Sequence, residues 1–237
     1  MRIIVGLTGA TGAIYGIRLL ERLRDAGVET HVVVSRWGLR TLAHETTYTR
    51  DQVEALASVW YAPGDMGAAI SSGSFATDGM VVAPCSVKTL AAIAHGYGDS
   101  LIHRAADVVL KERRRLVLVV REAPLSDIHL ENMLRASRAG AVILPPVPAF
   151  YNHPLSVADI VEHTVDRMLD QIGVPIPESR RWVGEMSAGV SVSREASRNA
   201  ASRSAGGEAG RDATQGAGRG VRSGARGDAR GDAGPDD

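Results

Sequence analysis

Residues 104–124 read RAADVVLKERRRLVLVVREAP, and this segment carries the strongest fold signal in the chain. Its apolar run Leu116–Val120 is rich in β-branched valine, continuous and bounded by charges, which is typical of a strand covered on both faces in a parallel sheet. We interpret Arg113–Arg115 as a solvated helix end, where cations complement the helix dipole. Arg121 and Glu122 stand at the carboxyl end of the strand, which is where open α/β sheets bind ligands.

Strand and helix signals alternate on both sides of this segment. The other predicted strands are Arg2–Leu7, Glu29–Ser35, Met80–Ala83 and Ala141–Leu144. The predicted helices are Ala13–Asp25, 36–45, Ser86–His95, Ala105–Arg114, His129–Ser137 and Val157–Ile172. This order predicts an α/β fold of the three-layer αβα, Rossmann-like (flavodoxin-like) kind, with a doubly wound, mostly parallel sheet.

The composition narrows the class of protein. A hydrophobic share of 44% in 237 residues is enough for a sizeable core. The formal net charge is zero, so nothing global indicates a nucleic acid or an anionic membrane as partner. No apolar run approaches the roughly 18 residues of a transmembrane helix. Cys85 is the only cysteine, which excludes an intramolecular disulfide, and we expect a cytoplasmic protein.

The composition changes after Trp182. No aromatic residue, leucine or isoleucine follows, while Gly, Ala, Ser, Arg and Asp recur. Such a segment cannot bury enough apolar area to offset the entropy lost on ordering. We therefore expect one domain over residues 1–185 and a disordered, low-complexity tail over residues 186–237.

Polar groups suited to phosphate follow four of the predicted strands. The first strand leads into Gly6–Gly12 (GLTGATG), which opens a helix with several backbone N–H groups and two hydroxyls. Another leads into Pro84–Thr89 (PCSVKT), a third ends at Ser35, and the fourth ends at Arg121–Glu122. Because parallel strands present their carboxyl ends at one edge of the sheet, and helix starts bind anions, these segments together predict a phosphate site.

Each segment also has a purely structural interpretation. The glycines can simply permit a tight turn, and their spacing matches neither a dinucleotide fingerprint nor a Walker loop. Ser86 and Thr89 can cap the helix that follows them. Cys85 has no adjacent base and fits a buried apolar role better than that of a nucleophile. The histidines have no metal-ligand spacing, so we expect no metal.

Two candidates follow the last predicted strand. Residues 145–154 (PPVPAFYNHP) are stiffened by prolines and present Tyr151 as a rigid phenol. We place Arg167 on the inner stripe of the last helix, where an arginine needs an anionic partner. A salt bridge to Asp166 or Asp170 is the alternative. We disfavour it because we treat these carboxylates as sequence neighbours rather than partners on the same helix face.

Six motifs are long, ordered and specific. They are GLTGATGAIYG (6–16), PCSVKTLAAIA (84–94), RAADVVLKERR (104–114), REAPL (121–125), HLENM (129–133) and PAFY (148–151). In these motifs the chain resembles the UbiX family of flavin prenyltransferases, over about Arg2 to Trp182. The resemblance implies metal-independent transfer of a dimethylallyl group from dimethylallyl monophosphate to N5 and C6 of reduced FMN. It further implies a homo-oligomer, a dodecamer with sites where subunits meet, and a product used by UbiD-type decarboxylases.

The same resemblance implies the site residues. The flavin would be held by Gly9, Ala10, Thr11, Ser35, Ser86, Val87, Lys88, Thr89 and Arg121. The prenyl phosphate would be surrounded by Lys111, Arg121, Glu122, Tyr151 and Arg167, with Arg104 supporting the site. The catalytic groups would be Glu45, Lys111, Glu122, Tyr151 and Thr11.

These residue types suit the implied chemistry. Cationic donors stabilise a departing phosphate, Tyr151 or Glu122 can donate a proton to it, and Glu45 near the flavin can assist proton transfer. The family usually has serine at the position of Thr11. The additional methyl group stiffens the rotamer, so we expect a slower proton relay and unchanged binding.

Two other functions are compatible with the fold. A flavin-dependent decarboxylase of the cysteine-decarboxylase branch typically has a PASANT segment where this chain has PCSVKT, and it lacks the phosphate-directed set Lys111, Arg121, Tyr151 and Arg167. A non-catalytic flavin carrier, or a chaperone for a decarboxylase, needs the flavin loops but not that set.

Overall fold

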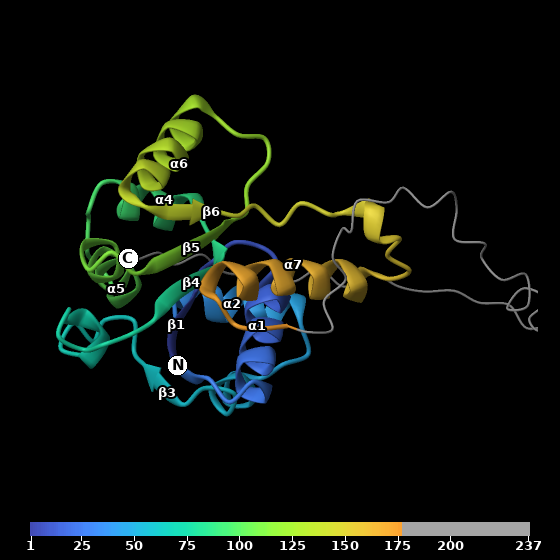
Figure 1. Cartoon of the computed structure of the whole chain (residues 1–237), viewed down its shortest axis with the longest axis horizontal. Helices are drawn as coiled ribbons and strands as arrows, with labels where there is room; N and C mark the ends of the chain where they lie inside the picture. The colour runs from blue at the N-terminus through green and yellow to red at the C-terminus, as the bar shows by residue number, and fades with distance from the viewer. Residues whose placement is uncertain (177–237) are drawn as a thin grey trace, which may run out of the picture. The chain divides into compact units, whose positions relative to one another are not determined.

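Six parallel strands form one sheet in the computed structural model, which describes residues 1–176 (Figure 1). The strands are β1 (Arg2–Leu7), β2 (Glu29–Val34), β3 (Val59–Tyr61), β4 (Gly79–Cys85), β5 (Arg115–Val120) and β6 (Ala141–Ile143). Their order is β3-β2-β1-β4-β5-β6, and every pairing is parallel. The predicted flavodoxin-like α/β fold is confirmed, whereas the predicted domain boundary near residue 185 and the tail 186–237 lie outside the described residues.

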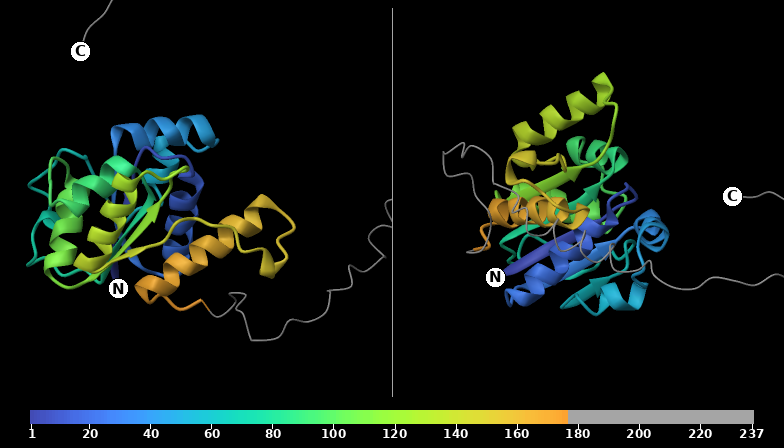
Figure 2. Two further views of the ribbon diagram at one scale, coloured as in Figure 1. Left: turned by 90° about the horizontal axis from the view of Figure 1, so that it is seen from above. Right: turned by 90° about the vertical axis from the view of Figure 1, so that its right-hand side faces the viewer.

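Helices cover both faces of the sheet (Figure 2). They are α1 (Ala13–Asp25), α2 (Arg36–Glu45), α3 (Arg50–Glu54), α4 (Val87–Ala94), α5 (Leu101–Lys111), α6 (Asp127–Ala139) and α7 (Val157–Ile172), with short 3₁₀ helices η1 (Ala69–Ser71) and η2 (Phe150–Asn152). Side chains alternate along each strand, so Ile3 and Val5 join the core under α1 and α7, while Ile4 joins the core under α4 and α5. Within residues 1–176, no helix is long and apolar enough to cross a bilayer.

The chain reverses its winding direction at β1. This strand pairs with β2 on one side and with β4 on the other, so the connections that follow β1 and β4 diverge and leave a crevice at their carboxyl ends. The buried Thr8 hydroxyl donates to the Pro84 carbonyl (2.8 Å) and accepts from the Ser86 N–H (2.8 Å). The two strand ends that border the crevice are therefore tied together.

The predicted helix Ala105–Arg114 is wrong at both ends. Helix α5 begins at Leu101, after the N-cap Ser100, and it stops at Lys111. Arg113 has a φ of 56°, which is incompatible with a continuing helix. The Arg114 guanidinium donates to the carbonyls of Gly73 (2.8 Å) and Phe75 (2.9 Å), so it anchors a loop rather than lying free in solvent as predicted.

Strand β3 and helix α3 lie in a stretch that the sequence pattern left unassigned. Strand β3 pairs with β2 at the edge of the sheet, but three residues are too few to show a periodicity. Helix α3 has five residues, and it begins with a capping box between Thr49 and Gln52. Because β3 was missed, the sequence predicted one strand fewer than the sheet contains.

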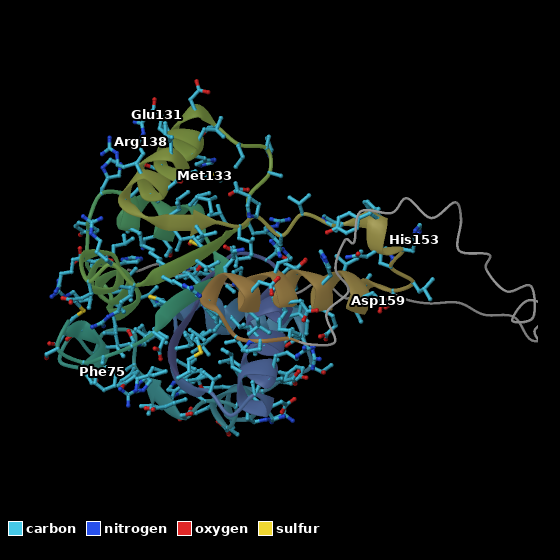
Figure 3. All side chains as sticks on the ribbon, in the orientation of Figure 1. Phe75, Glu131, Met133, Arg138, His153 and Asp159 are labelled. Atoms are coloured by element: carbon cyan, nitrogen blue, oxygen red, sulfur yellow. The ribbon has the colours of Figure 1, made fainter. Side chains whose placement is uncertain are left out.

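After β6 the chain leaves the sheet, forms η2 and returns as α7 (Figure 1). We call residues 144–156 the arm. His153 in the arm and Asp159 near the start of α7 lie at the far end of this projection (Figure 3). Leu155 is 93% exposed, and Val147 and Phe150 are each 71% exposed. Clustered exposed apolar side chains of this kind mark a contact surface.

Candidate functional site

A cavity of about 690 Å³ lies at the carboxyl ends of β1, β2, β4 and β5, and we call it the strand-end cavity. Its lining includes every residue predicted to hold a flavin, namely Gly9, Ala10, Thr11, Ser35, Ser86, Val87, Lys88, Thr89 and Arg121, together with Glu122. The volume suits a small-molecule ligand. The structure thus brings these residues together at the edge of the sheet where the sequence analysis expected a phosphate site.

Three helices begin at this cavity. Ser35, Ser86 and Ser100 are the N-caps of α2, α4 and α5, and all three line it. The Ser86 hydroxyl accepts from Thr89 N (3.3 Å), so the capping interpretation of Ser86 is correct, and the Ser35 hydroxyl accepts from Gly38 N (3.0 Å) in the same way. The N–H groups of each first turn have no partner inside their helix and favour an anion. Capping and phosphate binding are therefore compatible here.

Gly9 lies against Trp37 in the first turn of α2. A Cβ atom on Gly9 would be 2.4 Å from the Trp37 Cβ, so a larger residue cannot fit without displacing the helix. Trp37 lines the cavity and is 64% exposed. Its indole offers a stacking surface to a planar ligand. The sequence analysis missed Trp37 and its neighbour Arg36, although they directly follow the strand-end residue Ser35.

A second cavity, of about 550 Å³, shares Thr11 and Arg121 with the first, and we call it the side cavity. Part of its lining is apolar and comes from Ile14, Tyr15, Pro146, Val157 and Val161. The polar part includes Glu45. The side cavity can thus hold a small apolar group next to the cation of Arg121.

Glu45 ends α2 and caps α1. Its Oε2 accepts from the N–H groups of Gly12 (2.8 Å) and Ala13 (3.0 Å). Burial opposes ionisation of this carboxyl, but hydrogen bonds from the Thr11 hydroxyl and from these two N–H groups, with the charge of Arg121, hold its pKa below the ordinary value. Glu45 is therefore a carboxylate at neutral pH, and it lines the side cavity beside the shared residues Thr11 and Arg121.

Arg121 and Glu122 follow β5 as predicted. The Arg121 N–H donates to the Cys85 carbonyl (3.1 Å), which fixes the start of the turn. In the part of the chain that the structure describes, the Arg121 guanidinium has no hydrogen bond. Because it borders both cavities, it is available to an anionic ligand in either one.

Within one chain, Lys111 and Arg104 lie apart from the residues that line the two cavities. Lys111 ends α5 and pairs with Glu112, before β5 begins, whereas Arg121 follows the end of β5. The six residues of β5 span about 20 Å. Arg104 donates to the Ser71 carbonyl (3.1 Å) and pairs with Asp107 (2.8 Å). Neither cation lines the strand-end cavity or the side cavity.

Tyr151 and Arg167 also lie outside both cavities. Tyr151 lies in η2 on the arm, with its hydroxyl 3.5 Å from His163 Nε2. Arg167 is exposed and pairs with Asp170 at 2.7 Å. The prediction of an inner-stripe arginine is wrong, because residues three apart do share a helix face and Asp170 is such a partner.

Cys85 is fully buried, and burial raises the pKa of its thiol, so the predicted apolar role is confirmed. Among residues 1–176, no group of three His, Cys, Asp or Glu side chains has an arrangement that could hold a metal ion.

Comparison with known proteins identifies close relatives. Residues 1–169 match the protein family described as Flavoprotein. The chain is 60% identical over 189 residues to a probable UbiX-like flavin prenyltransferase of Streptomyces sp. (strain D7), which covers 79% of this chain and 94% of the relative.

Two solved structures agree with this similarity. AnUbiX (PadA1) in complex with FMN and dimethylallyl pyrophosphate has a TM-score of 0.76 at 55% identity, over 78% of this chain and 98% of that one. A dodecameric FMN-dependent UbiX-like decarboxylase from Escherichia coli O157:H7 has a TM-score of 0.76 at 59% identity, over 78% of this chain and all of that one.

Proposed function

Since this chain belongs to the UbiX-like flavin prenyltransferases of the flavoprotein family, we propose that it transfers a dimethylallyl group from dimethylallyl monophosphate to N5 and C6 of reduced FMN. The observation that carries the proposal is the pair of cavities that meet at Thr11 and Arg121. One cavity suits a phosphate-bearing planar ligand, and the other suits a small apolar group with an anionic end. Prenylated FMN would then serve UbiD-type decarboxylases, and the cytoplasmic location expected from the sequence stays a prediction.

The strand-end cavity fits FMN. Its helix starts and the cations Arg36 and Lys88 suit the phosphate, and Trp37 suits the ring system. Gly9, Ala10, Thr11, Ser35, Ser86, Val87, Lys88, Thr89 and Arg121 would hold the flavin. When bound, reduced FMN supplies the nucleophilic atoms N5 and C6. The relative AnUbiX, whose structure is described as a complex with FMN, supports this assignment.

The side cavity fits the prenyl donor. Ile14, Val157 and Val161 would contact the five-carbon chain, and Arg121 would meet the phosphate. Breaking the allylic carbon–oxygen bond leaves a phosphate anion beside an allylic cation. A guanidinium that is in place before the reaction stabilises the departing anion without reorganisation. Because cationic side chains can neutralise a monophosphate, we propose that no metal is needed.

Thr11 and Glu45 would handle a proton. The Thr11 hydroxyl lies beside the Glu45 carboxylate, so a proton lost from the flavin side would pass through the hydroxyl to the carboxylate. The carboxylate is ionised at neutral pH and is therefore ready to accept it. Glu122 and Tyr151 stay predicted donors to the departing phosphate.

We propose that neighbouring subunits complete the phosphate site. Lys111, Arg104, Tyr151 and Arg167 do not line either cavity of their own chain. The arm carries exposed apolar side chains that suit a subunit contact, and the similar Escherichia coli protein is described as dodecameric. In a homo-oligomer, a side chain that is remote from its own site can enter the site of the next subunit.

The test is anaerobic incubation of the protein with reduced FMN and EDTA, with dimethylallyl monophosphate or dimethylallyl pyrophosphate as donor, followed by mass spectrometry of the extracted flavin. We expect a flavin heavier by one prenyl unit with the monophosphate. Unmodified flavin from a protein that binds FMN would contradict the proposal and favour the carrier or the decarboxylase. Prenylation with the pyrophosphate alone would show that the donor is dimethylallyl pyrophosphate rather than the monophosphate.

A further inference from the structure

A histidine and an aspartate that the sequence analysis did not select both line the strand-end cavity. They are His103, in the first turn of α5, and Asp99, just before that helix. His103 Nδ1 lies 2.7 Å from Asp99 Oδ1. His103 is only 7% exposed, whereas the Asp99 side chain is 43% exposed. The imidazole is thus held by both its helix and its carboxylate partner.

The contact with Asp99 decides which nitrogen of the neutral ring is an acceptor. An ionised carboxylate only accepts hydrogen bonds, so Nδ1 carries the proton and Nε2 carries the lone pair. Across residues 1–176, no hydrogen bond to His103 Nε2 is present. Nε2 is not one of the fully buried side-chain nitrogen and oxygen atoms that lack a hydrogen-bond partner. It therefore keeps accessible surface, and the opening that His103 lines is the strand-end cavity.

The surroundings make this an ordered acceptor. Ser100 caps the helix turn that contains His103, with its hydroxyl 3.5 Å from the His103 N–H. Lys88, Arg36 and Arg121, which line the same cavity, are donors only, and Glu122 and Asp99 are acceptors whose charge suits cations. A neutral imidazole nitrogen is a different kind of acceptor, suited to an uncharged N–H or O–H of a ligand.

We propose that His103, oriented by Asp99, is a specificity-determining residue whose Nε2 accepts a hydrogen bond from the flavin bound in the strand-end cavity. The partner on the ligand is an uncharged donor, either the ring N3–H or a ribityl hydroxyl. This inference rests on the proposed function for the identity of the ligand. It does not depend on prenyl transfer, so a protein that binds FMN without prenylating it would leave the inference intact.

The test is a fluorescence titration of FMN with four variants of the full-length protein. His103→Phe removes the acceptor and keeps a ring, and we expect FMN to bind about fivefold more weakly, the effect of one neutral hydrogen bond. Asp99→Ala releases the ring and should give a smaller loss. His103→Gln supplies an amide oxygen and should recover part of the affinity. Asp25→Ala, at the exposed end of α1, is the control and should bind like the wild type.

Ligand analogues separate a contact from a structural effect. We test two analogues, 3-methyl-FMN and a ribityl-deoxy FMN, and expect the wild type to bind one of them more weakly than FMN. The His103→Phe protein should bind that same analogue as tightly as it binds FMN. The first analogue identifies the ring N–H, and the second identifies the ribityl hydroxyl. The proposal would be overturned if His103→Phe bound FMN as tightly as the wild type does. It would also be overturned if His103→Phe had a wild-type melting temperature and lost affinity equally for FMN and for both analogues.

Discussion

The Thr11 side chain lies beside the Glu45 carboxylate and lowers the pKa of that carboxyl, and this pair joins the turn after β1 to the end of α2. Glu45 also accepts from Gly12 and Ala13, so the start of α1 is held by the same carboxylate. Thr11 lines both the strand-end cavity and the side cavity. A hydroxyl and an ionised carboxylate therefore stand where the two proposed substrates would meet.

Replacing Glu45 with glutamine should separate catalysis from structure. The amide oxygen can still accept from Gly12 and Ala13, so we expect the FMN affinity to stay close to wild type and the melting temperature to fall only slightly. Loss of the proton acceptor should slow prenylated-flavin formation by about a hundredfold or more. Glu54→Gln on α3, where the carboxylate is exposed and paired with Arg50, is the control. A fully active Glu45→Gln protein would exclude a proton-transfer role.

The lowered pKa of Glu45 also predicts a pH dependence of stability. A carboxyl whose pKa is lowered on folding stabilises the folded state at pH values above its unfolded pKa, for which the ordinary value is 4.5. This stabilisation is lost as the pH falls through the lower pKa of the folded state. The difference in unfolding free energy between wild type and Glu45→Gln should be constant near neutral pH and shrink in acid. Urea titrations across that range measure it, and a difference that grows in acid would contradict the assignment.

Thr8→Val tests how the two strand ends are held together. Valine has the shape of threonine but leaves the Ser86 N–H without its buried partner, while the Pro84 carbonyl keeps only the backbone N–H of residue 8 (3.2 Å). We expect a loss of about 1–3 kcal/mol in the free energy of unfolding, measured by urea denaturation at one fixed protein concentration. Thr41→Val removes an exposed hydroxyl bonded only to the Trp37 carbonyl, and it should change the same quantity by less than about 0.5 kcal/mol.

Mixed oligomers test whether subunits share the site. Arg121→Ala and Lys111→Ala should each abolish or strongly reduce prenylation. If a site takes Arg121 from one subunit and Lys111 from another, randomly assembled mixtures of equal amounts should recover about a quarter of the wild-type activity, because both residues are then intact in that share of sites. Co-expression with two different tags provides the mixture. Recovery of no activity would place both residues in the site of a single subunit, and an active Lys111→Ala protein would remove Lys111 from the site.

The sequence predicted the parts of the site that follow buried strands. The uninterrupted apolar run before Arg121 and the glycine-rich turn after β1 both specify a strand end, and parallel strands bring such ends to one edge. For the same reason the predicted flavin residues Gly9 to Thr11 and Ser86 to Thr89 do line one cavity. Strand ends can be predicted from the sequence because the apolar pattern of each buried strand stops where the strand ends.

The remaining residues depend on geometry that a linear pattern does not contain. Trp37 and His103 lie within the first turns of helices, where only the three-dimensional arrangement shows that they face the strand-end cavity. Lys111 belongs to the same stretch 104–124 as Arg121, but β5 separates the two residues within one chain. Arg167 was placed on an inner stripe because a salt bridge to Asp170, which shares its helix face at i+3, was considered and wrongly rejected.

Carbon-13 NMR of the flavin product tests the central claim most directly. The protein would be incubated without oxygen with reduced FMN and a dimethylallyl monophosphate that carries ¹³C at both ends of the allyl group, and the flavin would then be extracted. We predict that both labelled carbons are bonded to the flavin, one at N5 and one at C6, so that a new ring is closed. Label found only in a free prenyl alcohol, or attached to the flavin through a single carbon, would contradict the account.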